Sequence, residues 1–189
     1  MCDLTDFFER NPLSRKIKSF DEEEIFLLTK YNLPVEIAGF LKLQGLSTYS
    51  DDFFWTTLPQ EHFQTFSEWG LNGKQCFAFL KTALGSLCYF YKGKIYQLEP
   101  ISGSVYKGRF DFYNFMNLLV PMDAFMESAY FDIYQKRKSN TKLKQDEIYG
   151  FFPALALGGS FESSEIKIVN FNEHLSFLAQ ANGNKAKKI

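Results

Sequence analysis

The sequence predicts an α+β fold in which a helical N-terminal portion with an antiparallel β-sheet is followed by an α-rich C-terminal portion with short strands. Apolar residues recur at helical spacing before residue 70 and again after residue 111. Residues 76–107 instead carry aromatic residues that alternate loosely, as strands do. Because the 189 residues include 22 Phe and 10 Tyr, the chain can bury a sizeable core and is not a disordered protein.

Three helices and a short strand are expected in the first 70 residues. Asp21 can cap a helix whose Glu24 lies at the third position after the cap, a pattern known as a capping box. A second helix is expected to begin at Pro34 and to end at Gly45. Residues 49–55 indicate a turn that enters a short strand, and a third helix is expected over 59–69.

The middle of the chain is expected to form the sheet. The step from Lys92 to Gly93 indicates a tight hairpin between two strands. The four predicted strands are Cys76–Thr82, Ser86–Tyr91, Lys94–Leu98 and Gly103–Lys107.

Helical spacing returns after the sheet. We expect helices over 112–119 and 122–133, because apolar residues recur there every three or four positions. A short strand is expected over 166–170, and Asn172 can cap a last helix. The polar, basic tail 182–189 is expected to be flexible.

The net charge of −1 conceals an asymmetry along the chain. Residues 1–70 carry 6 basic and 12 acidic side chains, whereas residues 71–189 carry 15 basic and 10 acidic ones. An acidic N-terminal half suits a basic partner, although an ordinary solvated surface explains the same pattern. The candidate partner-binding residues are acidic, with one aromatic anchor: Asp21, Glu22, Glu23, Glu24, Asp51, Asp52 and Tyr49.

No catalytic, metal or cofactor site is apparent in the sequence. The three cysteines form no Cys-x-x-Cys pair, the two histidines are isolated, and no phosphate-binding loop occurs. We therefore expect no metal, no cofactor and no enzymatic activity. One alternative is a small hydrolase that pairs Cys76 or Cys88 with His174. A solvated helix end or a nucleic-acid contact explains the five basic residues Lys136, Arg137, Lys138, Lys142 and Lys144.

The N-terminal residues have neither the basic nor the apolar segment of a secretory signal, and no apolar run has the length of a membrane helix. The sequence therefore predicts a cytoplasmic protein with no membrane partner. Its oligomeric state is left open.

Two stretches carry a family resemblance. The spacing of Leu33-Pro34, Phe54-Trp55, Pro59 and Trp69 resembles the GAD-related domain and, more distantly, SMI1/KNR4-type immunity folds. The segment DEIYGFFPALALGG at 146–159 resembles the C-terminal domain that accompanies it in immunity proteins of type VI secretion DNase effectors.

The resemblance implies a protein that binds and neutralises a cognate secreted toxin. It also implies two domains packed together, a GAD-related domain over 1–108 and an immunity-protein C-terminal domain over 109–189. The matching residues are interpreted as determinants of the fold: Trp55, Pro59, Gly85, Gly150, Phe152, Pro153, Gly158 and Gly159. Because an inhibitor of a DNase should be acidic and this chain is nearly neutral, the activity of the toxin stays open.

Overall fold

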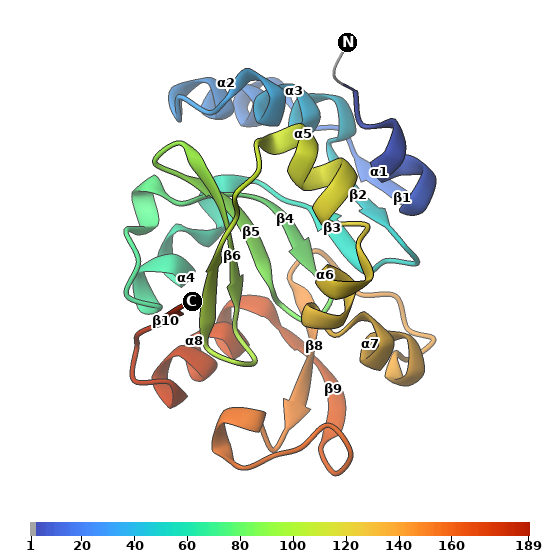
Figure 1. Cartoon of the computed structure of the whole chain (residues 1–189), viewed down its shortest axis with the longest axis vertical. Helices are drawn as coiled ribbons and strands as arrows, with labels where there is room; N and C mark the ends of the chain where they lie inside the picture. The colour runs from blue at the N-terminus through green and yellow to red at the C-terminus, as the bar shows by residue number, and fades with distance from the viewer. Residues whose placement is uncertain (1–2) are drawn as a thin grey trace.

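The computed structural model describes residues 3–189, which form a large sheet with helices against both of its faces (Figure 1). Three 3-10 turns (Pro59–His62, Gly73–Gln75 and Leu155–Leu157) and a π-helical turn (Phe115–Leu119) accompany the α-helices. The α-helices are α1 (Thr5–Arg10), α2 (Glu22–Lys30), α3 (Val35–Gln44), α4 (Phe63–Glu68), α5 (Phe112–Asn114), α6 (Asp123–Ser128), α7 (Phe131–Arg137) and α8 (Phe171–Ala181).

The strands form one eight-stranded sheet and a separate hairpin. The main sheet contains, in spatial order, β1 (Leu13–Lys18), β2 (Leu46–Tyr49), β3 (Phe54–Thr56), β4 (Phe77–Thr82), β5 (Leu87–Tyr91), β6 (Lys94–Glu99), β7 (Ser104–Lys107) and β10 (Lys187–Lys188). Neighbouring strands are antiparallel, except that β10 runs parallel to β7. β8 (Glu147–Phe152) pairs with β9 (Glu165–Asn170). The predicted α+β class is confirmed.

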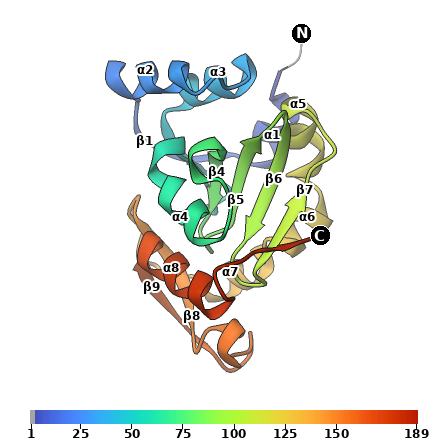
Figure 2. The ribbon, with the colours of Figure 1, turned by 90° about the vertical axis from the view of Figure 1, so that its left-hand side faces the viewer.

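Aromatic side chains hold helices to both faces of the sheet. On one face, Phe79 of β4 packs edge-on against Phe112 and Phe115, with ring centroids 5.5 and 6.0 Å apart. On the other face, Phe66 of α4 lies 4.7 Å from Tyr89 of β5. Figure 2 shows α4 and α8 on one side of the sheet and α5 and α6 on the other. The three layers follow from the alternation of side chains along each strand.

The local signals at the start of α2 and within the sheet are confirmed. Asp21 accepts from the Glu24 backbone N–H at 2.9 Å, and the Glu24 carboxylate accepts from the Asp21 N–H at 3.0 Å. These bonds satisfy two donors that the first helical turn leaves free. The four strands predicted over 76–107 are β4 to β7, with bounds that differ by one residue or less.

The predicted helix over 122–133 is wrong in one respect, because the chain breaks it in two. Tyr130 takes a left-handed conformation with φ of 59°, so α6 ends at Ser128 and α7 begins at Phe131. The Tyr130 ring packs against Phe161 at 4.9 Å. The apolar period continues across the break without Gly or Pro, which is why the periodicity alone did not reveal it.

The predicted helix over 112–119 is present in a different form. α5 covers only one turn, and the chain then widens into the π-helical turn, where the Val120 N–H donates to the Phe115 carbonyl at 2.9 Å.

The end of the chain also differs from the sequence expectation. The last helix begins two residues earlier, because Asn170 rather than Asn172 accepts from the Glu173 backbone N–H at 3.2 Å. The tail predicted to be flexible adds β10 to the sheet, and the Lys187 N–H donates to the Gly103 carbonyl at 2.8 Å. Backbone pairing holds this polar segment, and such pairing leaves no signal in side-chain hydropathy.

The N-terminal and C-terminal segments share one core. Phe54 of β3 lies 6.4 Å from Phe125 of α6, and the Tyr149 N–H of β8 donates to the Ala83 carbonyl at 2.9 Å. The division into 1–108 and 109–189 stays a prediction. Between residues 3 and 189, no helix is long and apolar enough to span a bilayer.

A carboxyl group is buried between the sheet and the helices. Glu99 of β6 is 1% exposed, accepts from the Ile101 backbone N–H at 3.0 Å and pairs with the Ser86 hydroxyl. Burial raises the pKa of Glu99 to about 7, because the charged form loses hydration. The folded state therefore binds more protons than the unfolded chain between pH 4.5 and pH 7, and the Glu99 contribution to stability is lost as the pH rises through this window.

Glu99→Gln should remove this pH dependence. We expect the stability of the variant relative to the wild type to increase by about 3 kcal/mol between pH 4.5 and pH 8. Urea unfolding at several pH values measures the difference. The same substitution at the exposed Glu127 is the control for the change itself. A Glu99→Gln difference that is identical at both ends of the range would contradict the assignment.

Candidate functional site

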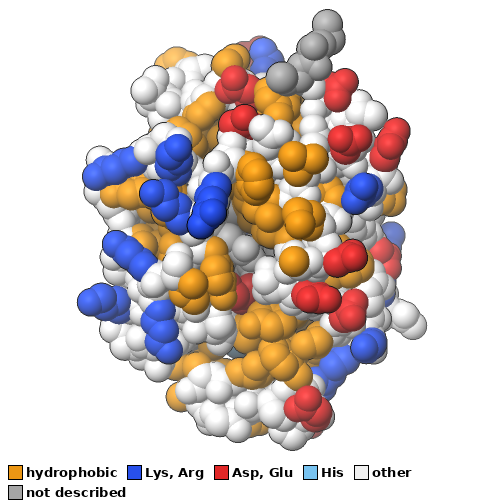
Figure 3. All heavy atoms as spheres, in the orientation of Figure 1, with side chains coloured by type: hydrophobic (Ala, Val, Ile, Leu, Met, Phe, Trp, Pro, Cys, Tyr) orange, Lys and Arg blue, Asp and Glu red, His pale blue; other side chains and the backbone are white. Residues whose placement is uncertain are grey.

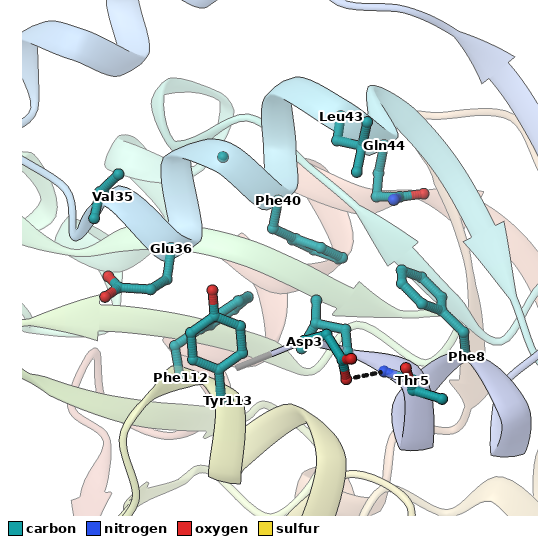
Figure 4. Close-up of a pocket in the computed structure, with 12 residues that line it drawn as sticks. Asp3, Thr5, Phe8, Val35, Glu36, Phe40, Leu43, Gln44, Phe112 and Tyr113 are labelled. Atoms are coloured by element: carbon teal, nitrogen blue, oxygen red, sulfur yellow. Dashed lines mark hydrogen bonds between the residues drawn. The ribbon is translucent and has the colours of Figure 1, made fainter. Parts of the chain in front are cut away.

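An apolar groove lies between three helical segments of one face of the molecule. It has a volume of about 500 Å³ and is bounded by the start of the chain with α1, by α3 and by α5. Figure 4 shows Phe8 from α1, Val35 to Gln44 from α3, and Phe112 and Tyr113 from α5 around one open space. The three helices cover the sheet but do not close over one another.

Buried aromatic side chains form the floor of the groove. Phe40 and Phe112 are each 5% exposed, and their ring centroids lie 5.6 Å apart. Tyr49, the predicted aromatic anchor, is fully buried and packs against Phe7 at 5.3 Å. Its hydroxyl donates to the Gln44 Oε1 at 2.8 Å, so Tyr49 acts below the surface by orienting a residue that lines the groove.

The wall that α3 contributes is apolar and exposed. Val35 is 77% exposed and Leu43 is 71% exposed, and with Gly39 they share one side of the helix at four-residue spacing. A Cβ atom added to Gly39 would have no neighbour within 4 Å, so the glycine leaves a gap between the two aliphatic side chains. Exposed aliphatic residues next to a hollow are typical of a protein-binding surface.

Carboxylates stand on the rim of the groove. Asp3 and Glu36 both line it. Asp3 accepts from the Thr5 backbone N–H at 3.1 Å, and this bond lowers the pKa of Asp3. Asn117 holds the segment in place, because its side chain accepts from the Phe7 N–H at 3.0 Å and donates to the Asp3 carbonyl at 2.6 Å.

A second hollow of about 370 Å³ adjoins the groove. It shares Glu36, Phe112 and Tyr113 with the groove and extends to Phe110, which is 39% exposed, and to Asp111. The two hollows together present an apolar surface bordered by Asp3, Glu36 and Asp111, with Lys94 as the one basic side chain among the lining residues.

The predicted acidic residues of α2 line neither of these hollows. Glu22 and Glu23 are exposed on α2, the helix beside α3 in Figure 1. Asp21 and Glu24 cap the helix, and Glu24 also pairs with Lys18 at 2.6 Å.

The predicted pair Asp51 and Asp52 lies away from α2, in the turn between β2 and β3 (Figure 1). Asp52 accepts from the Arg15 Nε at 2.9 Å and from the Thr48 hydroxyl at 2.5 Å. Asp51 pairs with Lys138. Both carboxylates thus already hold parts of the chain together.

Among the residues interpreted as fold determinants, two glycines lie where an added side chain would crowd a neighbouring element. Gly85 turns with φ of +92° between β4 and β5, and an added Cβ would lie 3.0 Å from Leu175 of α8 and 3.1 Å from Ile148 of β8. A Cβ on Gly150 would lie 2.8 Å from the His174 ring. The other members lie in strand β3, the first 3-10 turn, the last position of β8 and the β8–β9 connection: Trp55, Pro59, Phe152, Pro153, Gly158 and Gly159.

A buried lysine marks the seam between the sheet and the C-terminal segment. Lys81 of β4 is 2% exposed, donates to the Gln145 carbonyl and lies 5.4 Å from the Trp55 ring and 4.9 Å from the Phe171 ring. Burial lowers the pKa of Lys81 to about 8, and Glu61 and Asp146 act in the opposite direction. Because its hydrogen bond joins distant segments, we assign Lys81 a structural role.

The histidine beside this lysine is also buried. The His62 Nε2 lies 2.7 Å from the Thr57 hydroxyl, and burial lowers the pKa of His62 well below its usual value. A neutral His62 ring avoids repulsion by the buried Lys81 ammonium, so the two side chains can lie together between the sheet and the C-terminal segment.

The cysteine hydrolase alternative finds no support in the geometry. Cys76 and Cys88 are each 1% exposed, burial raises the pKa of the Cys76 thiol to about 12, and burial raises that of Cys88 further. A nucleophilic cysteine needs the opposite shift. His174 lies between Phe152 and Phe177, at 5.8 and 6.1 Å.

The basic segment 136–144 is divided among internal contacts. Arg137 donates to the carbonyls of Phe161 and Ser164, Lys138 pairs with Asp51, and Lys144 lies 3.4 Å from Glu147. Three of the five cations therefore contact other parts of the chain: Arg137 the β8–β9 connection, Lys138 the β2–β3 turn and Lys144 the start of β8. Residues 3–189 contain no cluster of three or more His, Cys, Asp or Glu side chains that could hold a metal ion.

The C-terminal part of the chain matches a known family. Residues 111–182 match the family described as T6SS immunity protein Tdi1, C-terminal. The match includes α5 to α8 and the β8–β9 hairpin, and it contains the 146–159 segment that carried the sequence resemblance. The resemblance of the N-terminal residues to the GAD-related and SMI1/KNR4-type proteins stays a prediction.

A solved structure shares the fold over nearly the whole chain. The crystal structure of Atu4351 from Agrobacterium tumefaciens superimposes with a TM-score of 0.73 at 16% sequence identity, and the alignment covers 95% of this chain and 89% of that one. No curated protein matches the sequence.

The groove residues Val35, Gly39 and Leu43 were missed in the sequence. A signal was present, because α3 also carries the buried Ile37 and Leu41 and is therefore apolar on more than one side. A surface helix that covers one core needs only one apolar stripe.

Proposed function

We propose that the protein is a cytoplasmic immunity protein that binds and neutralises a cognate secreted antibacterial toxin without catalysis. The observation that carries this proposal is the match of residues 111–182 to the C-terminal family of a type VI secretion immunity protein. The apolar groove supports it, because such a protein acts by binding and needs a surface for its partner.

The proposed occupant of the groove is a segment of the toxin that presents an apolar side chain flanked by basic ones. The apolar side chain would enter the gap at Gly39, between Val35 and Leu43. Burying each of these aliphatic residues contributes about 1.5–3 kcal/mol. The basic side chains would face Asp3 and Glu36 on the rim, where opposite charges favour the correct partner and accelerate association.

A nuclease is the toxin class that this charge pattern favours. Nucleases contact the phosphate backbone through basic side chains, so their binding surfaces carry the charge that complements an acidic rim. The nuclease activity and the type VI route of the toxin are part of the proposal.

Co-expression tests the proposed function directly. The candidate toxin is the protein encoded by the neighbouring gene, expressed alone and together with this chain. We expect the chain to restore growth and to co-purify with the toxin as a one-to-one complex. A folded chain that gives neither rescue nor a complex would overturn the immunity proposal for that toxin.

Substitution of Gly39 tests the groove separately. Gly39→Trp should fill the gap and weaken toxin binding by at least about tenfold, the loss typical of a central contact. Gly39→Ala is the matched control, because it favours the helix by about 0.5–1 kcal/mol and leaves most of the space open. Calorimetric titration with the purified toxin measures both dissociation constants. Equal toxin affinities of Gly39→Trp and Gly39→Ala would exclude the groove as the toxin contact. This conclusion holds even if the wild-type protein restores growth.

The acidic residues of α2 give a kinetic prediction. The double substitution Glu22→Lys and Glu23→Lys should slow association with the toxin several-fold at low salt and change dissociation little, because these exposed charges act over distance. Stopped-flow association rates at 50 and 300 mM salt measure the effect. Glu162→Lys, an exposed position in the β8–β9 connection, is the control. An association rate that the α2 substitutions leave unchanged would remove α2 from the interface.

A further inference from the structure

A third hollow lies on the face of the sheet opposite to the groove and has a different chemistry. It has a volume of about 320 Å³ and lies beside the end of α4, the strands β5 to β7 and the C-terminal strand β10. Neither the family match nor the proposed toxin contact assigns a role to it, because the toxin groove lies between α1, α3 and α5.

Three tyrosines form one wall of this hollow. Tyr89 and Tyr96 are directly paired across β5 and β6, and their rings stack with centroids 5.5 Å apart and an interplanar angle of 19°. Tyr91 lies two residues after Tyr89, on the same face of the strand, with its ring 6.0 Å from that of Tyr96. Tyr89 is buried, whereas Tyr91 and Tyr96 are only half-buried.

The hydroxyl groups of these tyrosines are free for a ligand. Within residues 3–189, no hydrogen bond involves the hydroxyl of Tyr89, Tyr91 or Tyr96. Polar groups that line a hollow without protein partners are available to position a bound molecule.

The charged side chains that line the hollow are both lysines. Lys107 comes from β7 and Lys188 from β10, the two parallel strands at this edge of the sheet. Lys92 on the β5–β6 turn does not line the hollow, but its ammonium group lies 5.3 Å from the centre of the Tyr91 ring. Figure 3 shows a group of Lys and Arg side chains on the side of the molecule where β6 and β10 lie, whereas the other side carries Asp and Glu side chains interspersed with Lys and Arg.

We propose that this tyrosine-lined hollow binds a nucleotide. The base would stack on the ring of Tyr91, which the Tyr96 ring meets edge-on, and the phosphate would pair with Lys107 and Lys188. Aromatic rings on a sheet surface with lysines around them suit this ligand, because every base has a flat π face and every phosphate is anionic. The ligand is either a free mononucleotide or one nucleotide of a single strand, which share the base and the phosphate.

Titration with two probes tests the proposal and separates the two sources. Calorimetry with AMP and with a ten-residue single-stranded oligodeoxyadenylate, each at 50 and 200 mM salt, measures the affinities. Binding of AMP supports a mononucleotide site. Binding of the oligonucleotide alone, with affinity that falls as salt rises, supports a single-strand site. The absence of binding by both probes at millimolar concentration would overturn the proposal.

Two substitutions locate the site. Tyr91→Leu should weaken binding by about tenfold, since one stacked base contributes about 1–3 kcal/mol. Lys107→Gln should weaken binding of the oligonucleotide and reduce the salt dependence by about one phosphate contact. Phe26→Leu and Lys42→Gln are the matched controls, because both residues are exposed on α2 and α3. Circular dichroism and urea unfolding verify that each variant is folded.

The result does not depend on the toxin experiments. If Tyr91→Leu and Lys107→Gln lose no more nucleotide affinity than the two control variants, any nucleotide binding lies elsewhere on the protein and the proposal is overturned. A loss of nucleotide affinity that is confined to Tyr91→Leu and Lys107→Gln would support the nucleotide site, even if the chain failed to rescue growth in the toxin experiment.

Discussion

The central strands of the sheet must be covered on both faces, and the rest of the structure follows from this constraint. β4 carries Phe79 toward one helical layer and Ala78 toward the other, and both residues are fully buried. The covering helices come from distant parts of the chain, α4 from the first half and α5, α6 and α8 from the second. The C-terminal segment therefore completes the core instead of forming a separate one, and Tyr149 of β8 is bonded directly to the β4–β5 turn.

Burial at the seams between these layers includes polar groups. Lys81 and Glu99 lie in the sheet at almost no exposure, and each shifts toward its neutral form because burial opposes charge. Buried groups of this kind are costly, and each is held by hydrogen bonds to residues from another segment or turn. Because an unpaired buried Lys81 or Glu99 would be costly, these hydrogen bonds select one packing arrangement at the boundaries between the layers. Apolar packing alone would select it less strictly.

The same covering leaves the groove and the tyrosine-lined hollow open, and the two differ in chemistry. The helices on one face meet around the groove of Val35, Gly39 and Leu43, which has an acidic rim. The other face is covered by α4 and α8 only in part, so Tyr91 and Tyr96 stay accessible beside lysines. The charge asymmetry along the sequence thus becomes an asymmetry between surfaces. An apolar groove with an acidic border suits a basic protein, and a tyrosine surface with a basic border suits a nucleotide.

The sequence alone determined the local elements whose signals lie within a few residues. The capping box of Asp21 and Glu24, the four strands from β4 to β7 and the turn at Gly93 depend on neighbours in the chain, and all were predictable. The tertiary structure decided the break at Tyr130, the burial of Tyr49 and the pairing of β10, because each depends on a contact with a distant segment. It also decided the candidate sites. Carboxylates can be located in the sequence, but a groove exists only where helices from different parts of the chain meet and leave space between them.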